Sequence, residues 1–258
     1  MKVHHFQDGV AICGDCMDPS VVDTVWQIAG QGVPLVIADP PYGGIVNEAW
    51  DNIITDGDLA LYLRDMTRTY ADLVVSGGAL YVWGGIGKPG SRAFLRYLVE
   101  TEQVGSLELA NLITWSKKRA YGVQHNYLWT REECAYWVHG DAKKPRTFNV
   151  PLLDQKRGYA GYNAKYPAKS EYLRRTNVWT DVTEIFRGKV HPTQKAQRVI
   201  EIPIQVHTDP GEYVIDPFAG SGTTGMACRA LGRKFILIEQ DPVHFDGMLS
   251  RLATDSGQ

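Results

Sequence analysis

Residues 213–225 read Tyr-Val-Ile-Asp-Pro-Phe-Ala-Gly-Ser-Gly-Thr-Thr-Gly, an apolar run followed by a glycine-rich turn and the start of a helix. The run is short and continuous, as in a buried strand of a parallel sheet. The glycines permit a tight turn and a close approach of a ligand, and free amides at the helix start favour an anion. This unit predicts an α/β fold with a ligand site at the end of the strand.

Six more apolar runs have the character of buried strands. They are Val10–Ile12, Leu35–Ala38, Ala79–Trp83, Leu112–Trp115, Cys134–Val138 and Phe235–Ile238. Helical spacing of apolar residues is found between them, over residues 58–75, 91–100, 194–206 and 223–231. Strands that alternate with helices indicate a doubly wound α/β sheet. We therefore expect a mostly parallel seven-stranded sheet with helices on both faces.

The bulk properties are those of a globular protein. The 258 residues fit a single α/β domain that carries an insertion. No run approaches the roughly 18 apolar residues of a membrane span, and the N-terminus lacks the apolar core of a signal peptide, so a cytoplasmic location is expected.

Cys13 and Cys16 form a CxxC pair. No second CxxC accompanies it, so we predict two small residues at a strand end and no metal site.

A basic segment, residues 140–178, interrupts this pattern. From Gly140 to Arg175 nine Lys or Arg residues face three acids, an excess of six, although the whole chain has a net charge of −2. Its composition fits a surface insertion or a target-recognition insert, because tyrosines among basic residues suit both phosphates and base faces. The candidate DNA-binding residues are Lys143, Lys144, Arg146, Lys156, Arg157, Arg174 and Arg175.

The motif Asp39-Pro40-Pro41-Tyr42 directly follows the strand Leu35–Ala38. The two prolines stop the strand and fix a rigid extended turn. An acid, a carbonyl and an aromatic ring are thereby held at the carboxyl edge of the sheet, where open α/β sheets bind ligands. The alternative is an ordinary proline-rich strand exit.

The glycine loop alone does not identify its ligand. Residues 220–225 also spell GxGxxG, which equally suggests a dinucleotide site. Glu239 ends the next strand, where an acid can accept from the ribose hydroxyls of either an adenosylmethionine or a nicotinamide cofactor. Lys195, in the stretch His191-Pro192-Thr193-Gln194-Lys195, could reach the carboxylate of an amino-acid moiety or could be a solvated helix lysine.

Together these motifs resemble the DNA amino-methyltransferases of the beta order, in which a DPPY motif precedes the cofactor-binding motif. The resemblance covers nearly the whole chain. One departure is Ala196, because the family usually continues with proline after the lysine. The segments that carry the resemblance are Gly14-Asp15, Asp39 to Tyr42, Trp50-Asp51, Trp115-Ser116-Lys117, Trp129 to Trp137, Asn177-Val178-Trp179, His191 to Lys195 and Asp216 to Thr224.

The resemblance implies a Rossmann-like fold and S-adenosyl-L-methionine as cofactor. It also implies that the Asp39 turn and the glycine loop end on neighbouring strands, and that Asp15 binds the adenine amino group of the cofactor. The implied cofactor-binding residues are Asp15, Asp39, Thr193, Lys195, Asp216, Phe218, Ala219, Gly220, Ser221, Gly222, Thr223, Thr224 and Glu239.

The implied substrate is double-stranded DNA with the target base flipped out. The implied catalytic residues are Asp39, Pro40, Pro41 and Tyr42. Asp39 and the Pro40 carbonyl would accept the two amino hydrogens, and Tyr42 would stack on the base. Asp39, where cytosine-N4 members have Ser, favours adenine N6. No Pro-Cys dipeptide is present, so cytosine carbon methylation lacks its nucleophile.

Other functions are compatible with parts of the sequence. An NAD-dependent oxidoreductase would explain the glycine loop and Glu239 but not the proline-rich strand exit. A catalytically silent DNA-binding module and a methyltransferase for RNA or protein amides are further alternatives. The motif order and the basic segment favour DNA. A homodimer and a restriction endonuclease partner are both compatible with the resemblance.

Overall fold

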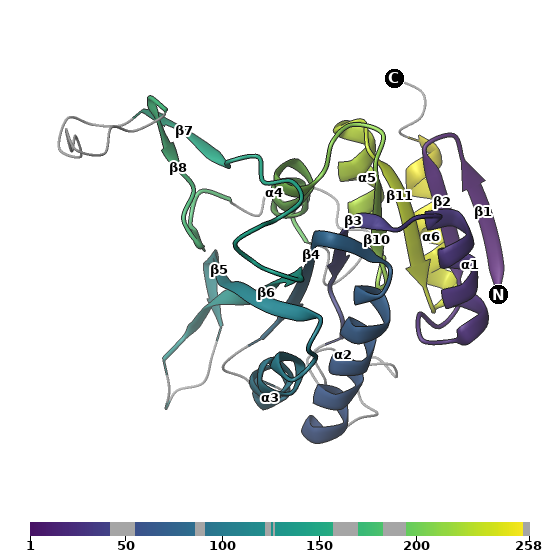
Figure 1. The fold of residues 1–258 in the computed structure, drawn as a ribbon, viewed down its shortest axis with the longest axis horizontal. Helices are drawn as coiled ribbons and strands as arrows, with labels where there is room; N and C mark the ends of the chain where they lie inside the picture. The colour runs from purple at the N-terminus through teal and green to yellow at the C-terminus, as the bar shows by residue number, and fades with distance from the viewer. Residues whose placement is uncertain are drawn as a thin grey trace.

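The computed structural model describes residues 1–41, 55–85, 91–121, 125, 127–156, 170–182 and 195–254. In these residues nine strands form one sheet in the order β1-β2-β11-β10-β3-β4-β6-β5-β9 (Figure 1). The strands are β1 Lys2–Phe6, β2 Gly9–Cys13, β3 Val33–Ala38, β4 Val74–Gly84, β5 Leu107–Tyr121, β6 Trp129–His139, β9 Val178–Trp179, β10 Tyr213–Asp216 and β11 Lys234–Glu239.

All seven predicted strands lie in this sheet, and β1 and β9 extend it at its two edges. Strands β2, β11, β10, β3 and β4 are parallel neighbours, whereas β6 pairs antiparallel with both β4 and β5. The doubly wound, mostly parallel fold is confirmed. The edge strands were not predicted because β1 has a polar, exposed pattern and β9 has only two residues.

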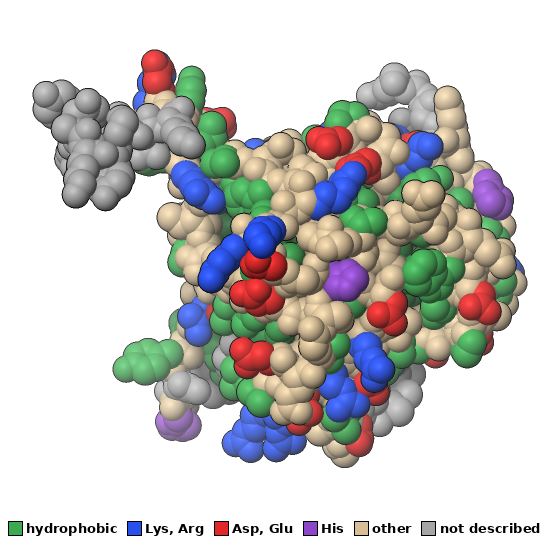
Figure 2. Space-filling view, viewed as in Figure 1, with side chains coloured by type: hydrophobic (Ala, Val, Ile, Leu, Met, Phe, Trp, Pro, Cys, Tyr) green, Lys and Arg blue, Asp and Glu red, His purple; other side chains and the backbone are tan. Residues whose placement is uncertain are grey.

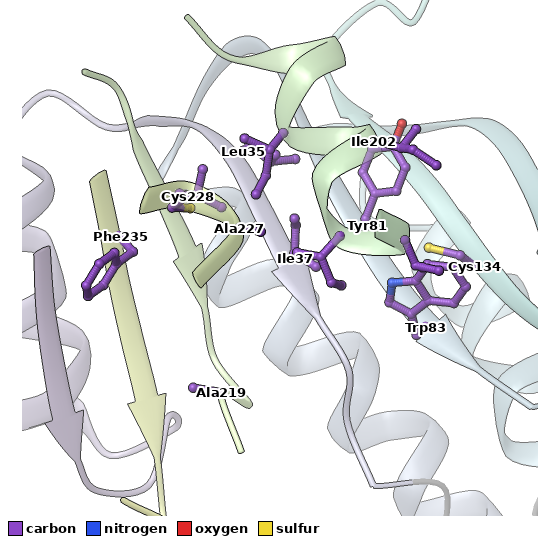
Figure 3. Packing of buried hydrophobic residues seen from close by; sticks show 14 of the residues in the cluster. Leu35, Ile37, Tyr81, Trp83, Cys134, Ile202, Ala219, Ala227, Cys228 and Phe235 are labelled. Carbon is purple, nitrogen blue, oxygen red and sulfur yellow. The ribbon is translucent and has the colours of Figure 1, made fainter. Parts of the chain in front are cut away.

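Helices cover both faces of the sheet. Alternate β3 residues point to opposite faces, so Leu35 and Ile37 pack with α4, α5 and α6, while Val36 and Ala38 pack with α1, α2 and α3. Figure 3 shows the first cluster. None of the described helices could cross a membrane. The helices are α1 Pro19–Ala29, α2 Asp56–Ala71, α3 Ser91–Glu102, α4 Gln197–His207, α5 Thr223–Ala230 and α6 Pro242–Thr254.

The helix predicted over residues 58–75 was too long at its C-terminal end. Helix α2 ends at Ala71, and β4 begins at Val74, before the predicted strand start at Ala79. The Val33 amide donates to the Leu73 carbonyl at 2.9 Å, and Val33 pairs with Val74 in the sheet. Pairing with β3 therefore overrides the helical spacing of the apolar residues.

The basic segment contains a hairpin of β7 (Leu152–Lys156) and β8 (Tyr172–Arg174), which projects from the body in Figure 1. The chain before the hairpin is fixed to the body, since the Arg146 amide donates to the Gly77 carbonyl at 2.7 Å and the Asn149 amide to the Val206 carbonyl at 2.8 Å. The base of the hairpin is thus held in place.

Candidate active site

Four carboxyl side chains follow the ends of four adjacent parallel strands. Asp15 follows β2, Glu239 ends β11, Asp216 ends β10 and Asp39 follows β3. These strands are neighbours in the order β2-β11-β10-β3. The carboxyl edge of the sheet is therefore acidic, and it can accept hydrogen bonds from amino and hydroxyl groups.

The Asp39 turn and the glycine loop are neighbours, as predicted. Strands β3 and β10 pair directly and in parallel, with Val36 opposite Ile215. Pro40 is buried and Pro41 half-buried, so the turn packs against the body where β3 ends. The residue that would stack on a base, Tyr42, lies outside the described residues.

Asp216 holds the glycine loop from inside the protein. Its carboxyl accepts from the Phe218 amide at 2.9 Å and from the Thr224 hydroxyl at 2.5 Å. Burial raises the pKa of Asp216 to about 7, although both hydrogen bonds oppose this rise. These two contacts join the strand end to helix α5 across the turn, so Asp216 and Thr224 fix the shape of the loop.

The outer part of the loop is open at Gly220. A Cβ added there would approach only the Phe218 carbonyl oxygen, at 4.0 Å. Gly222, the N-cap of α5, has φ 77° and ψ 25°, in the left-handed region that favours glycine. The backbone can therefore come close to a ligand at Gly220 while it turns sharply into the helix.

Arg251 of α6 supports this loop, a role that the sequence analysis missed. Its Nη1 donates to the Ser221 carbonyl at 2.9 Å and to the Ser221 and Thr223 hydroxyls at 3.1 and 3.2 Å. Both loop residues are buried. Nothing in the sequence distinguishes Arg251 from a solvated helix arginine, because its partners lie about thirty residues earlier in the chain.

Glu239, at the end of the adjacent strand β11, is held by two hydrogen bonds, and its carboxylate can accept more. Its Oε2 accepts from the Gly220 amide and its Oε1 from the Asp241 amide, both at 2.8 Å. Burial raises the pKa of this carboxyl. A carboxylate oxygen has two lone pairs, so each can accept one more hydrogen bond. This arrangement suits two neighbouring hydroxyl groups such as those of a ribose.

Asp15 lies next to Glu239 across the strand ends. The Gly14 amide donates to the Glu239 carbonyl at 3.0 Å, which ties the turn after β2 to the end of β11. The Asp15 side chain is exposed, and its Oδ1 accepts from the Met17 amide at 2.9 Å. The carboxyl is thereby oriented at the open edge of the sheet, where it can accept from an amino group.

Lys195 is buried beside Asp39. Its Nζ contacts Asp39 Oδ1 at 2.7 Å and Glu132 Oε2 at 3.1 Å, and it lies 4.8 Å from the centre of the Trp83 ring. From the sequence, Lys195 could have paired with a cofactor carboxylate or could have been a solvated helix lysine. In this structure it is buried before the start of α4 and pairs with two protein carboxylates, so it is not a solvated helix lysine. Glu132 was missed, since a glutamate in a strand carries no signal of its partners.

The pKa values of Lys195 and Glu132 are set by the opposite charges beside them. Burial opposes the charge of Lys195, but the nearby Asp39 and Glu132 raise its pKa well above the ordinary value. Burial likewise opposes the charge of Glu132, while Lys195 and Lys117 hold its pKa below the usual range. Lys195 and Glu132 are therefore both charged at neutral pH, and the half-buried Asp39 and Lys117 complete a group of two acids and two lysines.

The candidate DNA-binding residues differ in exposure and pairing. Arg175 is buried, with 4% of its side chain exposed, and contacts Asp181 at 2.5 Å. Arg146 is exposed but paired with Glu212 at 2.5 Å. Arg157, like the cofactor candidate Thr193, lies outside the described residues. The other exposed candidates are Lys143, Lys144, Lys156 and Arg174, of which Lys144 pairs with Asp141 at 3.5 Å and Lys156 with Glu171 at 3.6 Å.

The CxxC pair consists of buried free thiols. Cys16 Sγ lies 3.4 Å from the Tyr62 hydroxyl, and burial raises the pKa of this thiol to about 12. In the described residues no three His, Cys, Asp or Glu side chains are placed to hold a metal ion. Cys13 and Cys16 pack in the two hydrophobic clusters on opposite faces of the sheet.

Solved structures share this fold. The cytosine-N4-specific PvuII DNA methyltransferase aligns with a TM-score of 0.70 and 16% identity over 95% of this chain and 86% of that chain. The M1.HpyAVI complex with SAM aligns with a TM-score of 0.62 and 24% identity over 94% of this chain and 98% of that chain.

Sequence comparison identifies the family. The type II methyltransferase M2.DpnII of Streptococcus pneumoniae is 27% identical over 242 residues, which cover 88% of this chain and 84% of that protein. M2.LlaDCHI of Lactococcus lactis subsp. cremoris is 29% identical over 231 residues, 83% of this chain and 80% of that protein. The family model for N6/N4 DNA methylases matches residues 33–250. The chain therefore belongs to the N6/N4 DNA methylase family, which decides against the oxidoreductase alternative.

Proposed function

We propose that this protein transfers the methyl group of S-adenosyl-L-methionine to the exocyclic N6 of a flipped adenine in double-stranded DNA. The main support is the direct pairing of β3 with β10, since it brings the Asp39 turn beside the glycine loop. Membership of the N6/N4 DNA methylase family gives the reaction class. The choice of adenine rests on the aspartate at the first position of the DPPY motif.

The strand ends fit the cofactor. Glu239 has spare lone pairs for two ribose hydroxyls, and Asp15 is an exposed acceptor for the adenine amino group. Gly220 leaves room for a ligand against the loop backbone. When bound, the cofactor supplies an electrophilic methyl group. The described part of the site thus offers one group for each polar end of an adenosine.

Asp39 is the proposed acceptor for the target amino group. An exocyclic amine is a poor nucleophile, because its lone pair is conjugated with the ring. Hydrogen bonds from its two N–H groups to the Asp39 carboxylate and the Pro40 carbonyl would localise the lone pair toward the methyl group. As the N–C bond forms, the C–S bond would break with its electron pair left on sulfur, and the nitrogen would give up one proton to the Asp39 carboxylate. Alignment of the two reactants should supply much of the rate in this mechanism, because good orientation can be worth about 7–11 kcal/mol.

The target base is tested by product analysis. DNA methylated by the purified protein is digested to nucleosides, which are identified by mass. We expect N6-methyldeoxyadenosine. N4-methyldeoxycytidine as the sole product would reassign the base and leave the reaction class intact, whereas no methylated nucleoside at all would contradict the proposed activity.

The exposed cations of the basic segment are proposed to contact DNA phosphates. Lys156 and Arg174 lie on the two strands of the projecting hairpin, and Lys143 and Lys144 lie in the chain before it. We propose that residues 140–178 form the target-recognition region of a single domain.

The relatives bear the names of type II methyltransferases, so a cognate restriction endonuclease is the expected cellular partner. A homodimer stays a prediction that sedimentation analysis would test.

A further inference from the structure

The ionic group beside Asp39 connects four separate parts of the chain. Lys195 Nζ, just before α4, bridges Asp39 Oδ1 after β3 and Glu132 Oε2 on β6, at 2.7 and 3.1 Å. The other oxygen of Glu132, Oε1, accepts from Lys117 of β5. The order of contacts is therefore Asp39, Lys195, Glu132, Lys117, with negative and positive charges alternating.

We infer that Glu132 is a positioning residue for methyl transfer, which acts by holding the Lys195 ammonium against one oxygen of Asp39. This inference rests on the proposed role of Asp39 as acceptor. Lys195 contacts Oδ1 and so fixes the orientation of the carboxylate. The fixed orientation sets where the other acceptor positions of the carboxylate point, and the amino group of the target base is proposed to donate to one of them.

The ion pair between Lys195 and Glu132 is largely buried, so each charge depends on the other. The Lys195 side chain is 6% exposed and that of Glu132 16% exposed, so both charges are largely shielded from bulk water. A buried charge needs a partner, and a carboxylate shared between two lysines satisfies both of them. Lys195 divides its donors between two carboxylates, while the Trp83 ring lies on a further side. The ammonium therefore has one defined position.

Removal of the Glu132 charge would deprive Lys195 of its second carboxylate and keep the first, Asp39 at 2.7 Å. The buried Lys195 ammonium would then attract the Asp39 carboxylate more strongly, because it has lost its other carboxylate partner. The Asp39 carboxylate would turn toward Lys195. The target amino group would meet a misplaced acceptor. The chemical step should suffer, whereas the adenosine contacts at Glu239 and Asp15 lie two and three strands away from β3 and should not change.

The first test is Glu132→Gln, which keeps the shape and removes the charge. We expect kcat to fall roughly 10- to 100-fold, the range typical of a misplaced reacting group. The calorimetric Kd for S-adenosyl-L-methionine and the KM for DNA should stay within about twofold of wild type, on the argument that orientation rather than binding is impaired. An unchanged kcat, or a defect confined to cofactor affinity, would overturn the inference.

Glu201→Gln is the matched control. The Glu201 side chain is 19% exposed, and it accepts from Gln197 at 3.0 Å and from Arg198 at 3.3 Å, both on α4. Its exposure is thus close to the 16% of Glu132, but neither partner contacts Asp39 in the described structure. We expect an unchanged kcat. A decrease in kcat equal to that of Glu132→Gln would mean that the loss of any mostly buried carboxylate lowers the rate. That result would contradict a specific role for Glu132.

A double-mutant cycle separates positioning from general stability. If Glu132 acts through Lys195, its substitution should change kcat by less than about twofold once Lys195→Gln is present. If the fold decrease in kcat of the double variant equals the product of the decreases of the two single variants, the inference is overturned. This comparison stays decisive even if Glu132→Gln alone folds poorly, because the double variant removes both buried charges. An inactive wild-type protein would instead contradict the proposed function.

Discussion

Asp216 illustrates what a single buried carboxyl does at the end of a strand. Its two hydrogen bonds, from Phe218 and Thr224, shape the glycine loop, and burial raises its pKa to about 7. The folded protein therefore holds a proton that the unfolded chain releases near pH 4. The contribution of this carboxyl to stability is fully present below about pH 4 and is lost as the pH rises through about 7.

Asp216→Asn should remove this pH dependence. The free energy of unfolding of the wild type, relative to that of the variant, should fall between pH 4.5 and pH 8, because only the wild type has a carboxyl to ionise at this buried position. Urea unfolding of both proteins across this range measures the difference. A difference that stays constant with pH, or that moves in the opposite direction, would contradict the raised pKa.

Asp39 and Asp15 should separate chemistry from cofactor binding. Asp39→Ala should abolish methyl transfer and largely spare the affinity for S-adenosyl-L-methionine, since the proposed adenosine contacts at Glu239 and Asp15 lie on other strands. Asp15→Ala should give the opposite pattern, with weaker cofactor binding and residual transfer at saturating cofactor. Calorimetry and incorporation of labelled methyl groups measure the two properties. Full activity of the Asp39 variant would refute its role as acceptor.

At this scale the sequence predicts which residues lie at the carboxyl edge better than it predicts their partners. The strand-terminal acids Asp39, Asp216 and Glu239 follow from strand ends and short motifs. The contacts of Lys195 with Glu132 and of Arg251 with the loop depend on segments that are distant in the chain. No local pattern encodes such pairs, because their charges meet only after the sheet has formed.

Among the elements, the start of α5 depends most directly on one residue. Gly222 has φ 77°, and a Cβ there would lie 2.7 Å from Met248 Cγ. Gly222→Ala should lower the free energy of unfolding by about 1–3 kcal/mol, the cost of a strained left-handed residue. Cofactor affinity should fall as well, because the loop must shift. Chemical denaturation and calorimetry test both effects.

Gly247→Ala is the control for this substitution. Gly247 lies within α6, and a Cβ there would meet nothing within 4 Å. Alanine in the interior of a helix is favoured over glycine by roughly 0.5–1 kcal/mol, so this variant should be slightly more stable than wild type. Equal destabilisation by both changes would show that left-handed strain at Gly222 is not the cause.

The elements that sequence analysis missed have weak or misleading patterns. Helix α1 was not predicted, although Asp18 caps it by accepting from the Ser20 amide and Pro19 occupies its first turn, a recognisable helix start. The beginning of β4 was assigned to the preceding helix, because apolar spacing alone does not show where strand pairing takes over. Long buried runs such as β3 and β11 gave no such ambiguity.

For the whole molecule, the charge distribution sets how DNA is bound. Figure 2 shows Lys and Arg side chains interspersed with acidic ones on the visible face, so the body has no uniformly basic surface there. Lys156 and Arg174 are exposed residues on the two strands of the hairpin, which projects from the body in Figure 1. Contacts through a few exposed cations should make binding moderately dependent on salt.

The double variant Lys144→Ala and Lys156→Ala should weaken DNA binding more at low salt than at high salt. The slope of log K against log salt concentration should decrease by about 0.9 for each phosphate that the variant no longer neutralises. Lys234→Ala, at the opposite end of β11 from the site, should leave the slope unchanged. Fluorescence anisotropy over a salt series provides the slopes. An identical slope in the double variant and the wild type would exclude these lysines from the interface.

The sheet order has a consequence for synthesis on the ribosome. Strands β10 and β11 lie between β2 and β3, yet they are translated after every other strand of the sheet. Asp216 at the end of β10 is translated 178 residues after Ala38 at the end of β3, so the edge of β3 that pairs with β10 stays unpaired for about 9 to 36 seconds at elongation rates of about 5–20 residues per second. Exposed apolar edges are sites of misassembly, so chaperones that shield nascent chains should raise the yield of this protein.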